Sequence, residues 1–392
     1  MHIAVVGAGA MGADIVDELA RREPALTLTM IDADGARATT IAKESGLPKA
    51  NARTCYARDT ASLAQAIAGA TMTVNAAQYD TNVDVMRACL AAGSHYLDLG
   101  GMYHMTQQQL ELSADFERAG LTALLGMGAA PGLSNVLAAA ACEGLEQVEG
   151  VEMAFAAVAP DMPESDIFVP PYSIRTIMQE FCDPSFQFID GELRELPALA
   201  GRQRIRFPEP IGEVDCVHTL HSEPATLPGF LAGRGVREVT WRLGLPPQLE
   251  DIVQALAMAG LGSTTPLAVG DAAIAPVDFL AACIEDRIAR APRGSKQFTE
   301  VGCLRAEAWG SMGGAEVRVV VECVLETTGI APDVAGVMTG TPAAIAALML
   351  AAGEAGCPGA SGPERVITPS AMFAELAQCG FRTSRAEYRA LA

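Results

Sequence analysis

The first 131 residues alternate short apolar runs with amphipathic segments of helical length. Six runs have the length of strands: HIAVV, LTLTMI, RTCYA, TMTVNA, SHYLDL and LTALLG. Helical segments are predicted between them, at 10–21, 35–45, 61–68, 81–92 and 106–119. Strands that alternate with helices are typical of βαβ units, so this part of the chain is predicted to form a doubly wound parallel α/β sheet of the Rossmann type.

The pattern changes after Pro131, where strands follow one another without an intervening helix. The run FQFIDGELREL carries a hairpin signal at its Asp-Gly pair, and LRAEAWGSMGGAEVRVVVECVLE folds back at its Gly-Gly pair. VDCVHTLHSE and REVTWRLGL alternate with a period of two residues. These patterns predict an inserted α+β domain with a mixed, largely antiparallel sheet.

From about Thr341 the chain is helical again, in TPAAIAALMLAAG and PSAMFAELAQCG. The apolar run at 343–353 is too short to cross a bilayer and predicts a buried helix. We expect these helices to pack back on the first sheet. The predicted organisation is a first domain over 1–131, completed by C-terminal helices within 335–392, and a second domain over 132–334.

The motif G-x-G-x-x-G, formed by Gly7, Gly9 and Gly12, follows the first predicted strand and opens the first predicted helix. In this context the first glycine permits a tight turn, the second lets the backbone approach a pyrophosphate, and the third allows close packing of helix on sheet. Ala10 and Met11 begin the helix, whose free N–H groups would face the phosphates. The first domain is therefore predicted to bind a dinucleotide.

Asp32 stands at the end of the second predicted strand, twenty residues after the last glycine of the motif. A carboxylate there accepts hydrogen bonds from the adenosine ribose and repels a 2′-phosphate, which favours NAD over NADP. Arg37 is the nearby residue that would offset this repulsion. The fourth strand ends in Asn75, Ala76 and Ala77, where small residues leave room for the nicotinamide half of the cofactor or simply allow close packing.

Several segments carry a resemblance that extends over nearly the whole chain. They are TVNAAQYDTNVDVMRACLAAGSHYLDLGG, GMGAAPGLSNVLA, PYSIRTIMQEF, TLHSEPATLP, VTWRLGL and GTPAAIAALM. Together they resemble the saccharopine dehydrogenase-like family of nicotinamide enzymes, and within it the L-lysine 6-dehydrogenases. The resemblance implies a Rossmann domain, an inserted substrate domain and reversible oxidation of a C–N bond. Ala130 stands where saccharopine-forming members carry Asp before Pro-Gly, which argues against saccharopine as the substrate.

The resemblance implies NAD-dependent oxidative deamination of the side-chain amine of L-lysine or a related diamino acid, through an imine that water hydrolyses. A base must take a proton from the amine before hydride leaves the carbon. The substrate carboxylate needs a cation, preferably an arginine. Arg175 is predicted to bind it, with Tyr172 and His104 as further substrate contacts. The alternative for Arg175 is a surface residue paired with Glu180 or with solvent.

Four residues are predicted to take part in catalysis: Tyr79, Asp98, His221 and Glu223. The last two lie where an alternating strand enters a loop, and there His221 would shuttle a proton while Glu223 would bind the substrate ammonium. Tyr79 and Asp98 follow the fourth and fifth strands, near the expected nicotinamide. Packing is the alternative role for His221 and Tyr79, and bracing of the following glycine turn is the alternative for Asp98.

Two other functions stay open at this point. A saccharopine- or opine-type reductase would condense an amine with an oxo acid or semialdehyde. In the reductive direction it would require a second amino acid, whereas a deaminase running in reverse would require only ammonia. A non-catalytic nucleotide-binding regulatory protein would keep the glycine turn without turnover. The polar residues of the second domain argue against the regulatory protein, because a sensor does not need a second pocket lined by such residues.

The composition limits the classes of partner that we expect this protein to bind. A net charge of −20 with no basic cluster disfavours nucleic acids and anionic membrane surfaces. The ten cysteines lack the spacing of a zinc site, so no metal is expected. The N-terminus shows no signal-peptide pattern, and we expect a cytoplasmic enzyme with reduced thiols. Strand edges in the second domain would be left exposed in a monomer, so we expect a homodimer or a higher homo-oligomer.

Overall fold

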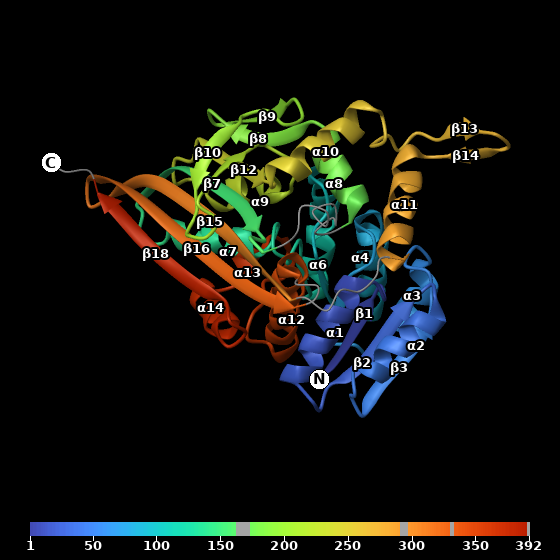
Figure 1. Ribbon diagram of the computed structural model, residues 1–392. Helices are drawn as coiled ribbons and strands as arrows, with labels where there is room; N and C mark the ends of the chain where they lie inside the picture. Colours follow the sequence, from blue (N-terminus) through green and yellow to red (C-terminus); the bar gives the residue numbers. More distant parts are fainter. Residues whose placement is uncertain (162–172, 291–296, 330–332, 390–392) are drawn as a thin grey trace.

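Two seven-stranded sheets organise the chain (Figure 1). The computed structural model describes residues 1–161, 173–290, 297–329 and 333–389. The first sheet lies with its helices around the N-terminus, and the long strands of the second sheet reach away toward the C-terminus (Figure 1). The predicted fold class, a parallel Rossmann sheet with an inserted domain built on a mixed sheet, is confirmed.

The first sheet is parallel throughout, in the order β17-β6-β5-β4-β1-β2-β3. Its strands are β1 (His2–Val6), β2 (Thr27–Asp32), β3 (Lys49–Thr54), β4 (Met72–Asn75), β5 (His95–Asp98), β6 (Thr122–Leu124) and β17 (Gly359–Ser361). Between them lie α1 (Ala10–Arg22), α2 (Gly35–Glu44), α3 (Thr60–Ala66), the 3₁₀ turn η1 (Tyr79–Thr81), α4 (Asn82–Ala92), α5 (Tyr103–Leu110) and α6 (Ser113–Ala119).

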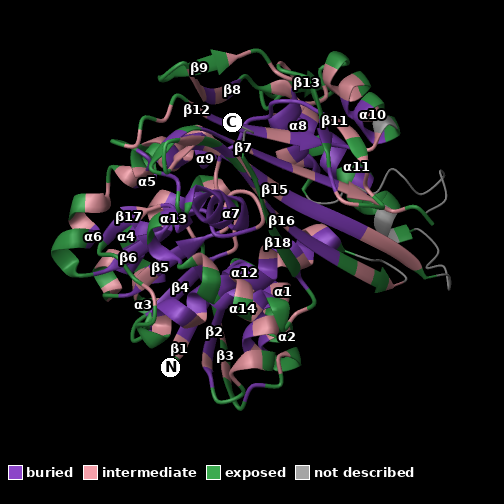
Figure 2. Ribbon diagram, turned by 90° about the vertical axis from the view of Figure 1, so that its left-hand side faces the viewer, coloured by how far each residue is buried: buried purple, intermediate pink, exposed green. Residues whose placement is uncertain are grey.

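Helices cover both faces of the first sheet, which is why its central strands are apolar at consecutive positions. In β1, Ile3 and Val5 join a cluster with residues of α1 and α12. Ala4 and Val6 point the other way and pack with Leu63 of α3 and with residues of α4. Figure 2 shows these strands as the buried interior of the domain.

The helix α12 (Val334–Ala352) belongs to the first domain although it follows the second along the chain. It packs on α1 and against β1, β4 and β5. Among the described helices, α12 is long and apolar enough to span a membrane, but most of it is buried inside the fold. It is therefore a core helix, as the apolar run at 343–353 predicts. The helices α13 (Pro363–Val366) and α14 (Pro369–Ala377) follow it.

The second sheet is mixed, in the order β18-β16-β15-β7-β12-β8-β9, and its one parallel pair is β7 with β12. Its strands are β7 (Gln147–Val158), β8 (Ser185–Ile189), β9 (Glu192–Leu196), β12 (Glu238–Gly244), β15 (Phe298–Met312), β16 (Ala315–Gly329) and β18 (Arg382–Arg389). Its helices are α7 (Leu133–Cys142), α8 (Ile174–Cys182), α9 (Glu223–Phe230), α10 (Pro247–Met258) and α11 (Pro276–Arg290). Two small hairpins pair β10 (Gln203–Arg206) with β11 (Glu213–Cys216), and β13 (Leu267–Val269) with β14 (Ala272–Ile274).

Two elements of the first domain differ from the sequence-based expectation. The sequence predicts the third strand in RTCYA, but KANART at 49–54 forms it; four of the six residues of this edge strand are exposed, so it carries no apolar run. The segment 106–119 was expected to be one helix but forms α5 and α6, which Glu111 and Leu112 separate.

Two elements of the second domain differ as well. The expected strand at 214–223 ends at Cys216; Val217 adds one further bridge to Leu243, and the chain then turns into α9. The segment 335–392 was expected to complete the first domain, yet β18 pairs with β16 of the second sheet. All eight residues of β18 are exposed, so no apolar pattern indicates this strand and the ladder hydrogen bonds hold it.

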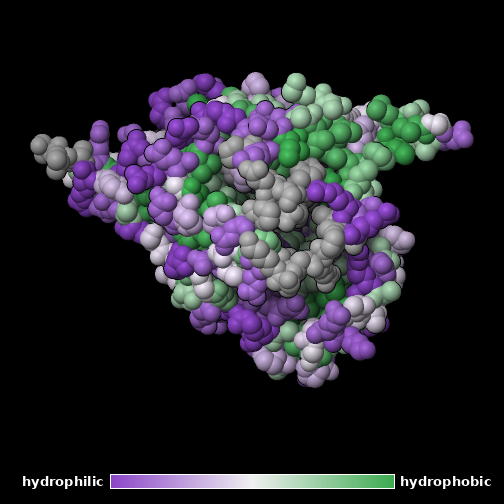
Figure 3. Space-filling model, viewed as in Figure 1, coloured by the Kyte–Doolittle hydropathy of each residue, from purple (hydrophilic) through white to green (hydrophobic). Residues whose placement is uncertain are grey.

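The β13–β14 hairpin projects from the second domain, and α11 follows it along the chain (Figure 1). Apolar side chains gather on the surface of this hairpin and over α10 (Figure 3). The exposed large ones are Met258, Leu267, Val269 and Phe279. The homo-oligomer expected from the sequence stays a prediction.

Candidate active site

The glycine turn between β1 and α1 leaves open space at the start of the helix. A Cβ on Gly12 would lie 1.9 Å from the Gly7 carbonyl oxygen, and a Cβ on Gly7 would lie 2.6 Å from the Ala77 nitrogen. These two glycines therefore allow helix, turn and β4 to approach one another. Gly9 differs, because a Cβ there would meet nothing within 4 Å, and no side chain caps the helix. The turn thus fits a dinucleotide pyrophosphate, which would occupy this space and accept hydrogen bonds from the free N–H groups of the helix.

Asp32 and Arg37 border the same cavity as the turn. One carboxylate oxygen of Asp32 accepts the Ala8 N–H at 2.6 Å, and the other accepts the Asp34 N–H at 2.7 Å. The carboxylate is therefore fixed at the end of β2 and keeps lone pairs free for ribose hydroxyls.

The end of β4 forms the next part of the wall. Ala76 and Ala77 line the cavity, whereas Asn75 is buried behind them. The Asn75 side chain donates to Asn82 at 2.8 Å and accepts the Ala77 N–H at 3.2 Å. Asn75 thus shapes the loop, and the two alanines are the residues placed to contact a cofactor.

One cavity of about 490 Å³ joins this turn to the second domain. From the first domain it is lined by Gly7, Gly9, Met11, Asp32, Arg37, Ala76, Ala77, Gln78, Tyr79, Leu99, Gly100, Gly101 and Met102. From the rest of the chain it is lined by Ala129, Ala130, Pro131, Phe155, Ser173, Thr176, Glu180, Leu220, His221, Trp241, Leu243, Leu304, Ala335, Gly336, Met338 and Thr339. Most of this second group is apolar or aromatic, with Glu180 and His221 as its titratable side chains.

His221 lies between two carboxylates in the second-domain wall. Its Nε2 is 3.4 Å from Glu180, its Nδ1 is 3.4 Å from Glu223, and its ring stacks on Trp241 with centroids 4.3 Å apart. Burial acts to lower the pKa of His221, but Glu223 and Glu180 outweigh it and raise the pKa to about 10. The imidazole is therefore a cation at neutral pH. Hydrogen bonds at catalytic sites often tighten only when the substrate is bound, and the two 3.4 Å contacts leave room for this.

The two glutamates beside His221 differ in their access to the cavity. Glu180, on α8, lines it, whereas Glu223, at the start of α9, has no exposed surface and lies behind the imidazole. Glu223 therefore lies outside the described cavity lining, and Glu180 is the glutamate that lines it. The sequence analysis did not single out Glu180 as a lining residue, although Ser173, Thr176 and Glu180 recur at helical spacing in PYSIRTIMQEF.

Tyr79 links the two domains beside the cavity. Its hydroxyl accepts a hydrogen bond from the Gln179 amide nitrogen at 3.1 Å and lies 3.3 Å from the amide oxygen. Burial raises the pKa of Tyr79, while the contact with Gln179 acts to lower it. The neutral phenol thus holds α8, which carries Glu180, against η1 of the first domain.

Asp98, predicted to be catalytic, braces the adjacent loop and is not among the residues that line the cavity. Its carboxylate accepts the N–H groups of Gly100 at 2.7 Å and Gly126 at 2.9 Å, and the Gln109 amide at 2.6 Å. Asp98 is 1% exposed, and this burial raises its pKa. The loop that it holds supplies Gly100 and Gly101 to the cavity wall.

The predicted substrate contacts Arg175 and His104 also lie outside the cavity lining. Arg175 pairs with Asp278 of α11 at 2.8 Å, so it holds α11 against α8. His104 is exposed and packs edge-on against Phe186 of β8, with centroids 4.8 Å apart. Tyr172 lies outside the described residues.

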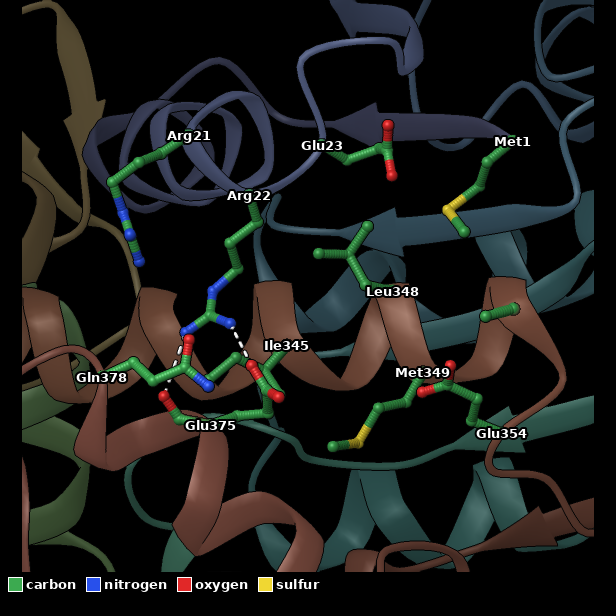
Figure 4. A pocket seen from close by; sticks show the side chains of 11 residues that line it. Met1, Arg21, Arg22, Glu23, Ile345, Leu348, Met349, Glu354, Glu375 and Gln378 are labelled. Atoms are coloured by element: carbon green, nitrogen blue, oxygen red, sulfur yellow. Dashed lines mark hydrogen bonds and ion pairs between the residues drawn. The ribbon is translucent and has the colours of Figure 1, made fainter.

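A second cavity, of about 500 Å³, lies between the end of α1, α12 and α14 (Figure 4). Arg22 enters it from α1 and pairs with Glu375 of α14. Its lining contains none of the glycine turn, Glu180 or His221. It is therefore separate from the candidate active site.

Two family models match successive parts of the chain. Residues 3–124 match the family described as saccharopine dehydrogenase NADP binding domain, and residues 128–381 match the saccharopine dehydrogenase C-terminal domain. The chain is also 24% identical over 396 residues to carboxyaminopropylagmatine dehydrogenase from Synechocystis, with 96% of each chain covered. It is 24% identical over 302 residues to carboxynorspermidine synthase from Vibrio alginolyticus, covering 72% of this chain and 70% of that protein.

A solved structure has the same fold. Saccharopine dehydrogenase (L-Glu forming) from Saccharomyces cerevisiae aligns over 99% of both chains with a TM-score of 0.74 and 15% identity. The two family matches together span most of the chain and meet at the loop before α7, where the two halves of the cavity also meet. The chain therefore belongs to the saccharopine dehydrogenase family and is an NAD(P)-dependent oxidoreductase.

Proposed function

We propose that this oxidoreductase forms a secondary amine, by reducing the imine between a cationic amine and a carbonyl compound that carries a carboxylate. The observation that carries the proposal is the single cavity that holds both the glycine turn and the His221–Glu180 pair. The two relatives described above are named for carboxylated amines of the polyamine type, which supports a substrate of this class. The condensing reaction, an alternative from the sequence, thus becomes the leading one.

The residues of the cavity suit a cationic substrate. Glu180 offers a carboxylate in a wall of apolar and aromatic side chains, where an ammonium group can pair with it and its carbon chain can pack on Trp241 and Phe155. His221 carries one positive charge against the two negative charges of Glu180 and Glu223. This local excess of negative charge favours an amine over an acid.

The protonated His221 is placed to act as a general acid. The substrate ammonium first loses one proton to water, because only the neutral amine nitrogen can attack the carbonyl carbon. The attack gives a carbinolamine, and its hydroxyl must leave as water with one added proton. His221 can give that proton from Nε2, which lies 3.4 Å from the cavity-lining Glu180, while Glu180 holds the amine. A bound reduced dinucleotide would supply the hydride that the resulting C=N carbon accepts. The reverse reaction returns the proton to the imidazole.

Oxidative deamination of L-lysine is the second candidate function. Glu180 would fit the primary ammonium of its side chain equally well, which keeps this reaction open. Its α-carboxylate needs a cation, as does the carboxylate of the carbonyl compound proposed above, and Arg175 is paired with Asp278 away from the cavity. The cation therefore does not separate the two reactions. Among the described lining residues, Arg37 is the one arginine and lies at the dinucleotide end. A regulatory role without turnover does not account for the His221–Glu180 pair.

A two-substrate assay tests the proposed function. With NAD(P)H, a diamine and an amino-acid semialdehyde or 2-oxo acid, we expect oxidation of the dinucleotide only when the amine and the carbonyl compound are both present. The secondary amine is identified by mass spectrometry. Formation of NADH and ammonia from lysine and NAD alone, with no activity in the two-substrate mixture, would establish the deaminase in its place.

We further propose that NAD is the preferred dinucleotide. Asp32→Asn removes the charge that repels a 2′-phosphate, and we expect the ratio of kcat/KM for NADP(H) over NAD(H) to rise about tenfold or more. Asp34→Asn is the matched control, because it removes the same charge two residues away at an exposed helix cap that does not line the cavity. A wild-type enzyme that already prefers NADP(H) contradicts this proposal.

A further inference from the structure

A line of buried polar side chains lies behind His221, on the side away from the cavity. Ser134 and Asn135, in the first turn of α7, each reach one buried carboxyl group. The Ser134 hydroxyl donates to Glu223 at 2.9 Å, and the Asn135 amide donates to Glu364 of α13 at 2.9 Å. All four side chains are at most 5% exposed.

Glu223 has no access to a substrate, so its contacts define what it can do. One carboxylate oxygen accepts the Ser134 hydroxyl, and the other faces Nδ1 of His221. A buried carboxylate is costly unless a cation or donors compensate it. Here the compensation comes from His221 and Ser134, and Glu223 in turn stabilises the charge on the imidazole.

The first turn of α7 also connects this pair to the cavity wall. The loop directly before it supplies Ala129, Ala130 and Pro131 to the lining. The Ser134 N–H donates to the Ala129 carbonyl at 2.9 Å, and the Asn135 side chain accepts the Gly132 N–H at 3.0 Å. The hydroxyl that holds Glu223 is thus fixed by the backbone that shapes the cavity.

We propose that Glu223 and Ser134 are positioning residues, which hold the proton and the orientation of His221 so that its Nε2 stays beside Glu180 of the cavity lining. This inference rests on the proposed function and deepens it. The charged groups that face the His221 ring among the described residues are Glu180 of α8 and Glu223 of α9. Trp241 of β12 stacks on the ring, and Ser134 of α7 acts through Glu223.

Glu364 provides a matched control. It is buried and bonded to the same turn of α7 as Glu223, but it makes no described contact with His221. Burial raises the pKa of Glu364, so the neutral Glu364→Gln side chain is a close replacement. Glu364→Gln therefore shows the effect of disturbing this buried region while Glu223 is kept beside His221.

The test measures the titration of the His221 imidazole by NMR in the protein without ligand, assigned with His221→Gln. Glu223→Gln is expected to lower the titration midpoint by about two pH units, and Ser134→Ala by about one, because each weakens the stabilisation of the imidazolium. Ser134→Thr keeps the hydroxyl and is expected to restore the midpoint. Glu364→Gln is expected to leave it unchanged.

The alkaline limb of the pH profile of kcat/KM should shift together with the NMR midpoint. The variants should rank in the same order by both measurements. An unmoved midpoint in a folded Glu223→Gln protein overturns the proposal, and so does an equal shift in Glu364→Gln. Should Glu223→Gln fail to fold, Ser134→Ala and Ser134→Thr carry the same test. A shifted midpoint in a protein without two-substrate activity would refute the proposed function alone, whereas an unmoved midpoint in an active enzyme would refute the positioning role alone.

Discussion

His221→Gln is expected to lower kcat of the two-substrate reaction by about 10²–10⁴-fold, the range for loss of a general acid. The imidazole lies 3.4 Å from Glu180, and both residues line the cavity. Glutamine keeps polar atoms at this position but cannot give a proton. Steady-state kinetics with saturating amine and carbonyl compound measure the loss.

The control for this prediction is His104→Gln, which changes an exposed histidine outside the cavity and should retain activity. The sequence alone predicts both His104 and His221 at the site, whereas the structure places His221 in the cavity lining and His104 outside it. Comparing the two variants therefore tests the structural assignment. Comparable losses in the two variants, or full activity in His221→Gln, would contradict the role of His221.

The protonation of His221 gives this prediction a pH dependence. Its pKa is raised from 6.5 to about 10, so the native imidazole stays charged until the pH approaches 10. The stabilisation from its ion pairs is full below about pH 6.5 and is lost progressively as the pH rises through about 10. Thermal stability of the wild-type protein should therefore decline over this range, and activity should fall at its alkaline end.

Gly9→Ala is expected to weaken dinucleotide binding about tenfold or more while leaving the protein folded. A Cβ at Gly9 meets no protein atom within 4 Å, and the φ of −79° suits alanine. The added methyl group would instead occupy space that the pyrophosphate needs. Titration of NAD(H) into the protein, followed by the fluorescence of Trp241 in the cavity wall, measures the affinity.

Gly12→Ala is the comparison variant for Gly9→Ala. Its Cβ would lie 1.9 Å from the Gly7 carbonyl oxygen, so it should lower the melting temperature as well as the affinity. Unchanged affinity in Gly9→Ala would show that the dinucleotide does not cross this turn. A melting temperature lowered equally in both variants would show that the open space at Gly9 is not as the structure describes it.

The first domain could be predicted from the sequence because its signals are local. Continuous apolar runs mark strands that are buried on both faces, and the spacing of Gly7, Gly9 and Gly12 encodes one turn. The elements that escaped prediction are edge strands. Residues 49–54 and 382–389 form β3 and β18 without an apolar pattern, because backbone pairing with a neighbour is what places them.

The candidate site was harder to predict because the role of a charged side chain depends on its partner. Arg175 and Glu180 lie on the same helix, yet one pairs with Asp278 of α11 and the other faces His221. Asp98 and Glu223 are both buried carboxylates, but backbone N–H groups surround the first and an imidazole faces the second. These partners come from other elements, so no local pattern distinguishes the roles.

The pairing of β17 with β6 has a consequence for biosynthesis. Gly359 lies beside Thr122, and α12 covers the sheet face that Ile3 and Val5 form. A ribosome that has completed the first six strands must therefore synthesise the second domain, except for β18, before this sheet acquires its covering helix and its last strand. The apolar face that α12 covers stays open throughout that time, and such exposed surface favours aggregation of the nascent chain until α12 is made.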